Sequence, residues 1–153
     1  MSQAANTTNF RQSLGRMGED LAEAYLRNLG WTIVERNYFA HRLGEIDIIA
    51  QPPAERLLVF IEVKTRDIKA QAQVNGLDHS GQLAVDRRKQ KRLIRAAMAY
   101  LRARPSGWGL RFDVLLVDVQ RSQALPDIVR AGDLEGLNNV SKIIHLQDIV
   151  GSF

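Results

Sequence analysis

Apolar and polar residues alternate along this chain at two different periods, which predict helices and strands in turn. Apolar residues three or four positions apart predict a first helix over 13–29, with Ser13 as its N-cap and Gly30 as its stop. Residues 1–12 lack such a stripe, and we expect them to form a flexible tail. Residues 13–153 are then expected to form a single domain.

Short apolar runs bounded by turn residues predict the strands. The run over 57–61 is apolar on both faces, which is typical of a central strand that is covered on both sides. A second amphipathic helix is predicted over 86–104, between the candidate cap Asp86 and Pro105, which would end it. The predicted strands cover residues 31–38, 43–50, 57–66 and 111–119, with a short edge strand over 143–146; residues 67–85 are expected to form a mobile loop and residues 120–140 a turn-rich segment.

The resulting order is α-β-β-β-α-β, which indicates an α/β fold with a mixed sheet flanked by helices. The third strand, the second helix and the fourth strand form a βαβ unit, whose crossover should be right-handed and whose strands should be parallel. The second and third strands are separated only by a proline-containing turn at residues 51–54, so they can pair as a hairpin.

Composition and charge narrow the classes of function. The net charge of +4 and the pI of about 9.8 are a mild indication of a polyanionic partner. The sequence has no cysteine, which excludes disulfides, thiolate zinc sites and a cysteine nucleophile. No apolar run approaches the roughly 20 residues that span a membrane, and the first residues lack an apolar signal core. We therefore expect a cytoplasmic protein with no membrane partner.

Two carboxylates and a lysine interrupt apolar strands in the middle of the chain. Asp47 stands in the run 44–50, and Glu62 and Lys64 stand in the run 60–66. Strand alternation places Glu62 and Lys64 on one face, and a hairpin can bring Asp47 beside Glu62. Buried ionisable groups are costly unless they are paired or bind a cation. These residues therefore form either a structural salt bridge at a strand end or a cation site.

We predict the cation site, because a single salt bridge leaves Asp47 unexplained. Asp47 and Glu62 supply the oxygen ligands that Mg²⁺ (or Mn²⁺) prefers, and the carbonyl of Val63 can add another. A bound metal would lower the pKa of a water and neutralise charge on a phosphate. Lys64 would orient the attacking water or stabilise the transition state as a point charge. The pattern therefore predicts metal-dependent cleavage of a phosphodiester.

Two further carboxylates each allow more than one interpretation. Glu19 is either an exposed charge near a helix N-terminus or a group that binds metal or water. Gly15, Gly18 and Ala22 surround it, and such small residues permit the close approach of a backbone or ligand. Glu45 can be read in three ways: as a ligand of a second metal, as a carboxylate that supports the ligands of the first metal without binding it, or as a charge exposed to solvent.

The second predicted helix begins with a dense set of cations. Cations at a helix N-terminus oppose the macrodipole, so helix stability does not explain them. They form either a basic face exposed to solvent or a surface that binds the phosphates along a nucleic-acid backbone. We predict the phosphate-binding surface. Gln90 lies near the apolar stripe of this helix and can reach the active site. The predicted nucleic-acid-binding residues are Arg87, Arg88, Lys89, Lys91, Arg92 and Arg95.

Other polar and aromatic residues are assigned to the framework. Tyr38, Phe39 and Trp108 can stack on bases, but we expect each to pack in the core or in a loop. Asp113 lies beside Arg111 in an apolar strand, and we expect it to form a structural ion pair or a cap contact.

Several short segments between residues 14 and 117 together form a recognisable pattern. They are Gly15–Glu19, Gly44–Asp47, Phe60–Arg66, Ala84–Asp86, Lys89–Gln90, Ala96–Leu101 and Arg111–Val114. An aspartate followed about fifteen residues later by Glu-x-Lys, on consecutive strands after a helix, resembles the PD-(D/E)xK nuclease superfamily. The set as a whole resembles the YraN family of small bacterial proteins.

The resemblance implies a restriction-endonuclease-like core, similar to that of archaeal Holliday junction resolvases. In that core a helix glutamate, an aspartate, a glutamate and a lysine form the site. In this sequence the matching positions are Glu19, Asp47, Glu62 and Lys64. The resemblance also supports a role for Gln90 in the site. The proline that often precedes the aspartate is replaced here by Glu45 and Ile46, which leaves the ligands intact.

We therefore expect a Mg²⁺-dependent endonuclease that hydrolyses DNA, with branched DNA or repair intermediates as the leading substrates. One alternative is a nucleic-acid-binding module that keeps the fold but cleaves nothing, and another is an RNA-processing nuclease of the same fold. Symmetric cleavage of a junction would require a homodimer. Its surface would include apolar residues near the chain end, unless these complete the monomer core: Ile143, Ile144, Leu146, Ile149, Val150 and Phe153.

Overall fold

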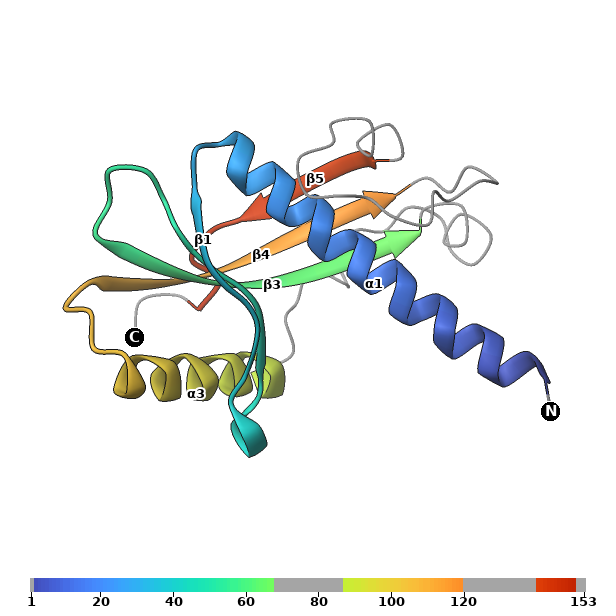
Figure 1. Cartoon of the computed structure of the whole chain (residues 1–153), viewed down its shortest axis with the longest axis horizontal. Helices are drawn as coiled ribbons and strands as arrows, with labels where there is room; N and C mark the ends of the chain where they lie inside the picture. Colours follow the sequence, from blue (N-terminus) through green and yellow to red (C-terminus); the bar gives the residue numbers. More distant parts are fainter. Residues whose placement is uncertain (1, 68–86, 120–139, 151–153) are drawn as a thin grey trace.

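In the part of the chain that the structure describes, five strands form one mixed sheet, with one helix over each face (Figure 1). The computed structural model describes residues 2–67, 87–119 and 140–150, and the side chains among them except those of 2–11, 140 and 141. The predicted α/β class, with a restriction-endonuclease-like order of elements, is confirmed. The elements are α1 Ser2–Asn28, β1 Thr32–Phe39, the short 3-10 helix η1 His41–Leu43, β2 Glu45–Gln51, β3 Leu57–Asp67, α3 Arg87–Ala103, β4 Gly109–Val119 and β5 Val140–Leu146.

The strands lie in the order β1-β2-β3-β4-β5. Strands β1 and β2, and β2 and β3, pair as antiparallel neighbours, so the predicted hairpin is confirmed. Strands β3 and β4 are parallel along their whole length, from Leu57 opposite Gly109 to Asp67 opposite Val119, as the βαβ interpretation predicts. Strand β5 closes the far edge, antiparallel to β4. The predicted loop over 67–85 and the turn-rich segment over 120–140 are wrong at one residue each, because Asp67 ends β3 and Val140 begins β5. The rest of both segments and the cap Asp86 lie outside the described residues.

Alternation along β3 divides the core between the two faces. Val59 and Ile61 pack with Leu21, Ala22 and Leu26 of α1. Residues of β3 on the opposite face, Leu58 and Phe60, pack with the buried stripe of α3, namely Leu93, Ala96, Ala97 and Tyr100. Strand β3 is therefore covered on both sides, as its continuous apolar run predicts.

Helix α1 begins at Ser2, so the predicted helix start at Ser13 is wrong, and residues 2–12, which we expected to form a tail, are helical. Once the packed part of a helix has formed, each further residue adds a hydrogen bond at little cost, and no apolar stripe is needed. The predicted stop is confirmed: Gly30 has a φ of +80°, and the N–H of Trp31 donates to the carbonyl of Leu26 at 3.0 Å. No helix within the described residues is long and apolar enough to cross a membrane.

A buried ion cluster joins β4 to β5 and the residues that follow it. Arg111 donates two hydrogen bonds to Asp113, each at 2.9 Å, and His145 lies 2.8 Å from the same carboxylate. The main-chain N–H of Asp148 donates a further bond at 3.0 Å. Burial alone would raise the pKa of Asp113, but these hydrogen bonds outweigh it and hold the pKa below its ordinary value. The expected structural ion pair is confirmed.

The apolar residues near the chain end pack within the monomer. Ile144, Leu146 and Ile149 lie against Val114 and Leu116 of β4. The interpretation that this segment completes the monomer core is therefore confirmed for these residues, while Phe153 lies outside the described residues. A homodimer stays a prediction.

Helix α1 approaches β3 most closely at Gly18. A Cβ atom at this position would lie 2.7 Å from the Cβ of Thr65 and overlap the rest of that side chain. A Cβ at Gly15, one turn earlier, would meet nothing within 4 Å. Gly18 thus sets the height of α1 above the sheet, and with it the position of Glu19.

We expect Gly18→Ala to lower the free energy of unfolding by about 1–3 kcal/mol, because the extra methyl group must displace either α1 or Thr65. Gly15→Ala is the matched control and should raise it by up to about 1 kcal/mol, because alanine favours helix where space is open. Urea denaturation measures both values. Equal effects at the two positions would show that the helix does not rest on Thr65.

Candidate active site

The site begins where β2 and β3 separate. Their pairing runs from Ala50 opposite Val59 to Ile48 opposite Ile61, and the same register would next place Asp47 opposite Glu62. Instead of a backbone-to-backbone bond, the main-chain N–H of Val63 donates to the Oδ2 atom of Asp47 at 2.6 Å. The side chain of Asp47 therefore lies in the fork between the two strands, next to Glu62, as predicted.

The carboxyl group of Asp47 is held in an unfavourable environment for a charge. Burial raises its pKa to about 7, and the nearby charges of Glu62, Glu19 and Glu45 add to this effect. The hydrogen bond from Val63 acts in the opposite direction but does not compensate. Four carboxylates from α1, β2 and β3 thus interact electrostatically at one point.

Glu62 lies opposite Asp47, and both positive and negative charges act on its pKa. Burial raises its pKa, while the cations of Lys89 and then Lys64 lower it, and Glu45 raises it again. The predicted pair of Glu62 and Lys64 on one face of β3 therefore interacts. The charge of Lys89, on α3, lowers the pKa of Glu62 more than the charge of Lys64 does.

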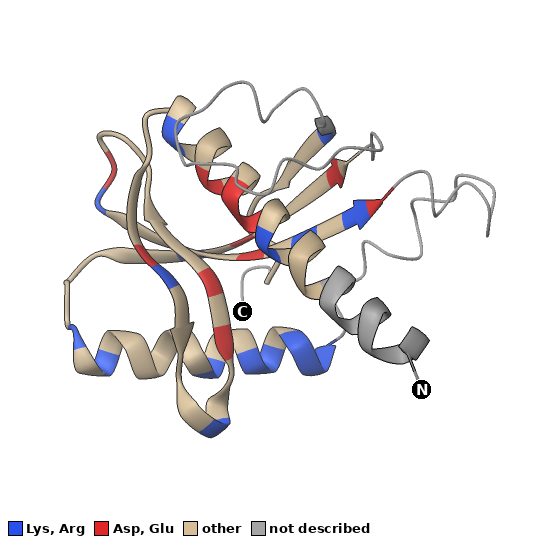
Figure 2. Ribbon diagram, turned by 45° about the vertical axis from the view of Figure 1, so that its right-hand side comes forward, with Lys and Arg blue, Asp and Glu red and all other residues tan. Residues whose placement is uncertain are grey.

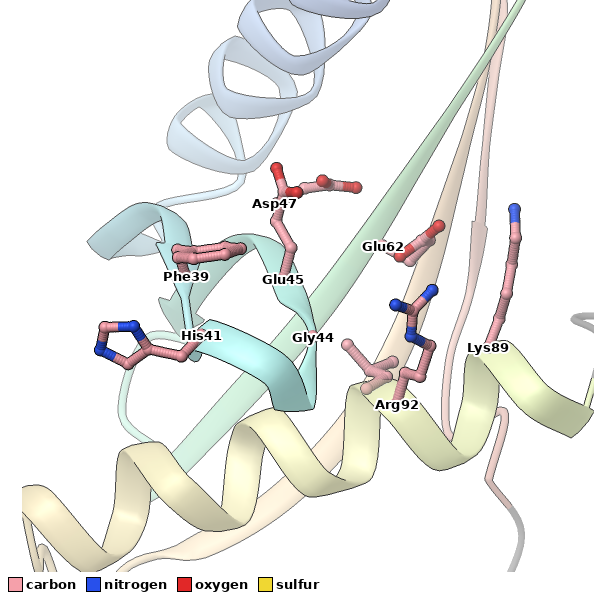
Figure 3. A pocket seen from close by; sticks show the side chains of 9 residues that line it. Phe39, His41, Gly44, Glu45, Asp47, Glu62, Lys89 and Arg92 are labelled. Atoms are coloured by element: carbon pink, nitrogen blue, oxygen red, sulfur yellow. The ribbon is translucent and has the colours of Figure 1, made fainter.

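An open pocket contains both central carboxylates (Figure 3). The aromatic rings of Phe39 and His41 lie on one side of the carboxylates, and the cations of Lys89 and Arg92 lie on the other. The lining residues are Phe39, His41, Gly44, Glu45, Asp47, Glu62, Lys89, Arg92 and Leu93.

Gly44 brings β2 close to α3 and so brings the two charged sides of the pocket together. Its φ of +142° is one that residues with a side chain rarely adopt. A Cβ atom there would lie 3.0 Å from the carbonyl oxygen of Arg92. Only glycine allows the start of β2, and hence Glu45, to sit directly against the α3 backbone.

Glu19 reaches the same carboxylates from the α1 side. Its side chain is 20% exposed and lies 3.6 Å from a guanidinium nitrogen of Arg36. Arg36 also contacts Asp20 and Glu23, at 2.8 and 2.7 Å, so one arginine of β1 anchors three acidic side chains of α1. Glu19 is therefore not a solvated helix charge. It lines a second hollow, which it shares with Gln12, Gly15, Arg16, Asn37 and Glu45.

Not every predicted site residue reaches the pocket. Lys64 acts on Glu62 by its charge but does not line the pocket, and neither does Gln90. Helical spacing places Gln90 with Ile94 on one flank of the buried stripe of α3, and Lys89 with Arg92 on the other flank. The sequence could locate both flanks but could not tell which of them faces Asp47.

The predicted basic surface of α3 is exposed and lies below the acidic strands. Figure 2 shows Lys and Arg along α3, close to the Asp and Glu segments of β2. All six predicted cations are exposed. Of these, only Lys89 and Arg92 line the pocket.

Comparisons with known proteins identify relatives over most of the chain. The family model described as uncharacterised protein family UPF0102 matches residues 18–117. A UPF0102 protein of a Mycobacterium species is 42% identical over 130 residues, which is 83% of this chain and 88% of the relative. A UPF0102 protein of Desulfitobacterium hafniense is 38% identical over 125 residues, covering 80% of this chain and 95% of the relative. The matched region includes all the carboxylates of the pocket.

The raised pKa of Asp47 predicts that this residue destabilises the protein at neutral and higher pH. Its ordinary pKa is 3.8, so between about pH 4 and 7 the folded protein keeps a proton that the unfolded chain has lost. The contribution of Asp47 to the stability of the folded protein is therefore fully present below about pH 4 and is lost as the pH rises through about 7. Asp47→Asn stays neutral and can still accept the bond from Val63.

We therefore expect Asp47→Asn to raise Tm by a few °C at pH 8, with a gain that shrinks as the pH falls toward 4. Thermal unfolding without divalent cations, at several pH values, measures this difference. Glu55→Gln, in the exposed turn between β2 and β3, is the control and should follow the wild-type profile. A lower Tm for Asp47→Asn at pH 8 would contradict the assignment.

Proposed function

The chain belongs to the UPF0102 family, and from the geometry of its site we propose that it is a divalent-metal-dependent endonuclease that hydrolyses phosphodiester bonds in DNA. The observation that carries this proposal is the convergence of Asp47 and Glu62 in the fork between β2 and β3, beside the cations of α3. Acidic residues would hold the metal, and the cations would hold the phosphates on either side of the scissile bond.

The donor atoms in the fork suit Mg²⁺ or Mn²⁺. Oδ2 of Asp47 accepts the bond from Val63, which leaves Oδ1 and the Glu62 carboxylate as oxygen ligands. In an extended strand the N–H and C=O of one residue point to the same side, so the carbonyl of Val63 also points toward β2. Within the described residues no group of three His, Asp or Glu side chains is placed to hold a metal, so waters would complete the shell. A cation would offset the repulsion between the carboxylates.

Each remaining group has a distinct part in this proposal. The metal, when bound, would supply a more acidic water and neutralise charge on the phosphate. Lys64 would stabilise the negative charge that develops on the phosphate, and Lys89 would hold a phosphate oxygen beside Glu62. Glu19, fixed by Arg36, would accept a hydrogen bond from water in the site.

The acidic set favours an enzyme over a module that only binds nucleic acid. Carboxylates repel phosphates, so a protein that only bound nucleic acid would gain nothing from placing four of them in its binding surface. DNA, and branched DNA in particular, is proposed from the resemblance to junction resolvases. A homodimer belongs to the same proposal, because two symmetric cuts need two sites. An RNA substrate of the same site is tested by including RNA in the cleavage assay.

We expect Glu62→Gln to lose Mn²⁺ binding and cleavage together, because it removes one of two carboxylate ligands. Lys64→Met should keep Mn²⁺ affinity within a few-fold but lose roughly 10²-fold in rate, because an ammonium group stabilises phosphate charge without binding the metal. Calorimetry measures metal binding, and a panel of duplex, flap, junction and single-stranded DNA, with RNA, measures cleavage. The proposal is wrong if both variants bind and cleave as the wild type does.

Binding should depend on salt through the two cations that line the pocket. Replacing Lys89 and Arg92 with Gln should flatten the slope of log K against log salt by about 1.8, from roughly 0.9 per phosphate contact. The control replaces Lys91 and Arg95, which helical spacing places on the outer face of α3, and should flatten it less. A larger change in the control would move the path of the nucleic acid to the outer face.

A further inference from the structure

Phe39 is the most exposed large apolar residue within the described part of the chain, and it stands at the rim of the acidic pocket. It is 63% exposed, whereas the other aromatic residues that we expected to pack do so. Tyr38 lies edge-on to Tyr100 at 5.1 Å, and Trp108 packs against the core beneath α3. Phe39 does not pack in the core; its ring contacts that of His41, in the connection that follows β1, and its exposure costs the protein buried apolar area.

The short connection between β1 and β2 holds Phe39 in this exposed position. Ala40, the next residue, is buried in the core beneath α3. Its N–H donates to the carbonyl of Gly44 at 2.9 Å, and Gly44 rests on the main chain of Arg92. The ring of His41 lies 5.9 Å from that of Phe39 in an edge-on arrangement. The main chain next to Phe39 is therefore held in place, and its ring contacts that of His41 on one side, which lowers the entropy lost when the ring binds a flat partner.

The charges around the pocket determine which part of a nucleotide can lie on Phe39. Phe39 is paired directly across the hairpin with Glu45, whose carboxylate repels phosphates. The cations that attract phosphates, Lys89 and Arg92, lie on the opposite side of the carboxylates (Figure 3). A phosphate chain therefore runs on the α3 side, and the uncharged base is the part of the nucleotide that fits the Phe39 side.

We propose that Phe39 stacks on an unpaired nucleobase next to the scissile phosphate, so that the substrate is single-stranded at the cleaved step. A base inside a duplex has both faces covered by its neighbours and has to leave the stack before it can lie on an aromatic ring. This inference rests on the proposed function and narrows it to flaps, frayed ends and single strands.

The test measures binding without cleavage, in EDTA and in a Glu62→Gln background. The probes are a short single-stranded DNA containing 2-aminopurine, whose fluorescence reports stacking, the same DNA as a duplex, and an oligonucleotide of equal length without bases. Phe39→Ala should weaken single-strand binding at least about fivefold and abolish the fluorescence change, while duplex and abasic binding stay unchanged. Phe39→Trp should restore both, and Leu110→Ala, an exposed apolar residue of β4, is the control.

The outcomes separate this inference from the proposed function. Equal losses for single strand and duplex, or no loss with Phe39→Ala, would overturn the stacking role and leave the nuclease proposal standing. If the protein with Phe39 intact binds none of the probes, the proposed function falls and the stacking role falls with it.

Discussion

The hydrogen bond from the Val63 N–H to Asp47 is the interaction on which the arrangement of the site depends. It replaces a backbone bond at the point where β2 and β3 would otherwise continue to pair. Because a side chain takes this place, the two strands can part without leaving a buried N–H unpaired. The fork holds Asp47 beside Glu62, and Gly18 and Gly44 bring α1 and α3 close enough to add charges from both sides. The repulsion that results is a stability cost of the kind that functional sites carry.

Much of the framework could be predicted because its signals are local. The continuous apolar run over residues 57–61 indicated a strand covered on both sides, and the βαβ order required β3 and β4 to be parallel. Asp47 and Glu62 were found because carboxylates inside apolar strands need an explanation in charge or metal chemistry. Their position in one fork followed from the hairpin register alone.

The rest depended on contacts between distant elements, which a local pattern does not contain. Lys89 and Gln90 are neighbours in sequence, and only the rotation of α3 against β2 decides that Lys89 lines the pocket. The anchor of Glu19, Arg36, lies on a different element, so its role had no signal near Glu19. Phe39 looked like a core residue because its type usually is one. Its exposure is decided by Ala40 and Gly44, which fill the space beneath the hairpin connection.

The buried Asp113 cluster bears on the order in which the protein folds during synthesis. Glu19, Asp47 and Glu62 leave the ribosome well before His145 and Asp148, two of the partners of Asp113. Until those partners arrive, Arg111 of the same strand is the one partner of the Asp113 cluster that has been made, so β4 gains its full set of hydrogen bonds beside β3 only late. The residues that complete the packing of β4 are therefore among the last of the described chain to be made, long after the carboxylates of the pocket.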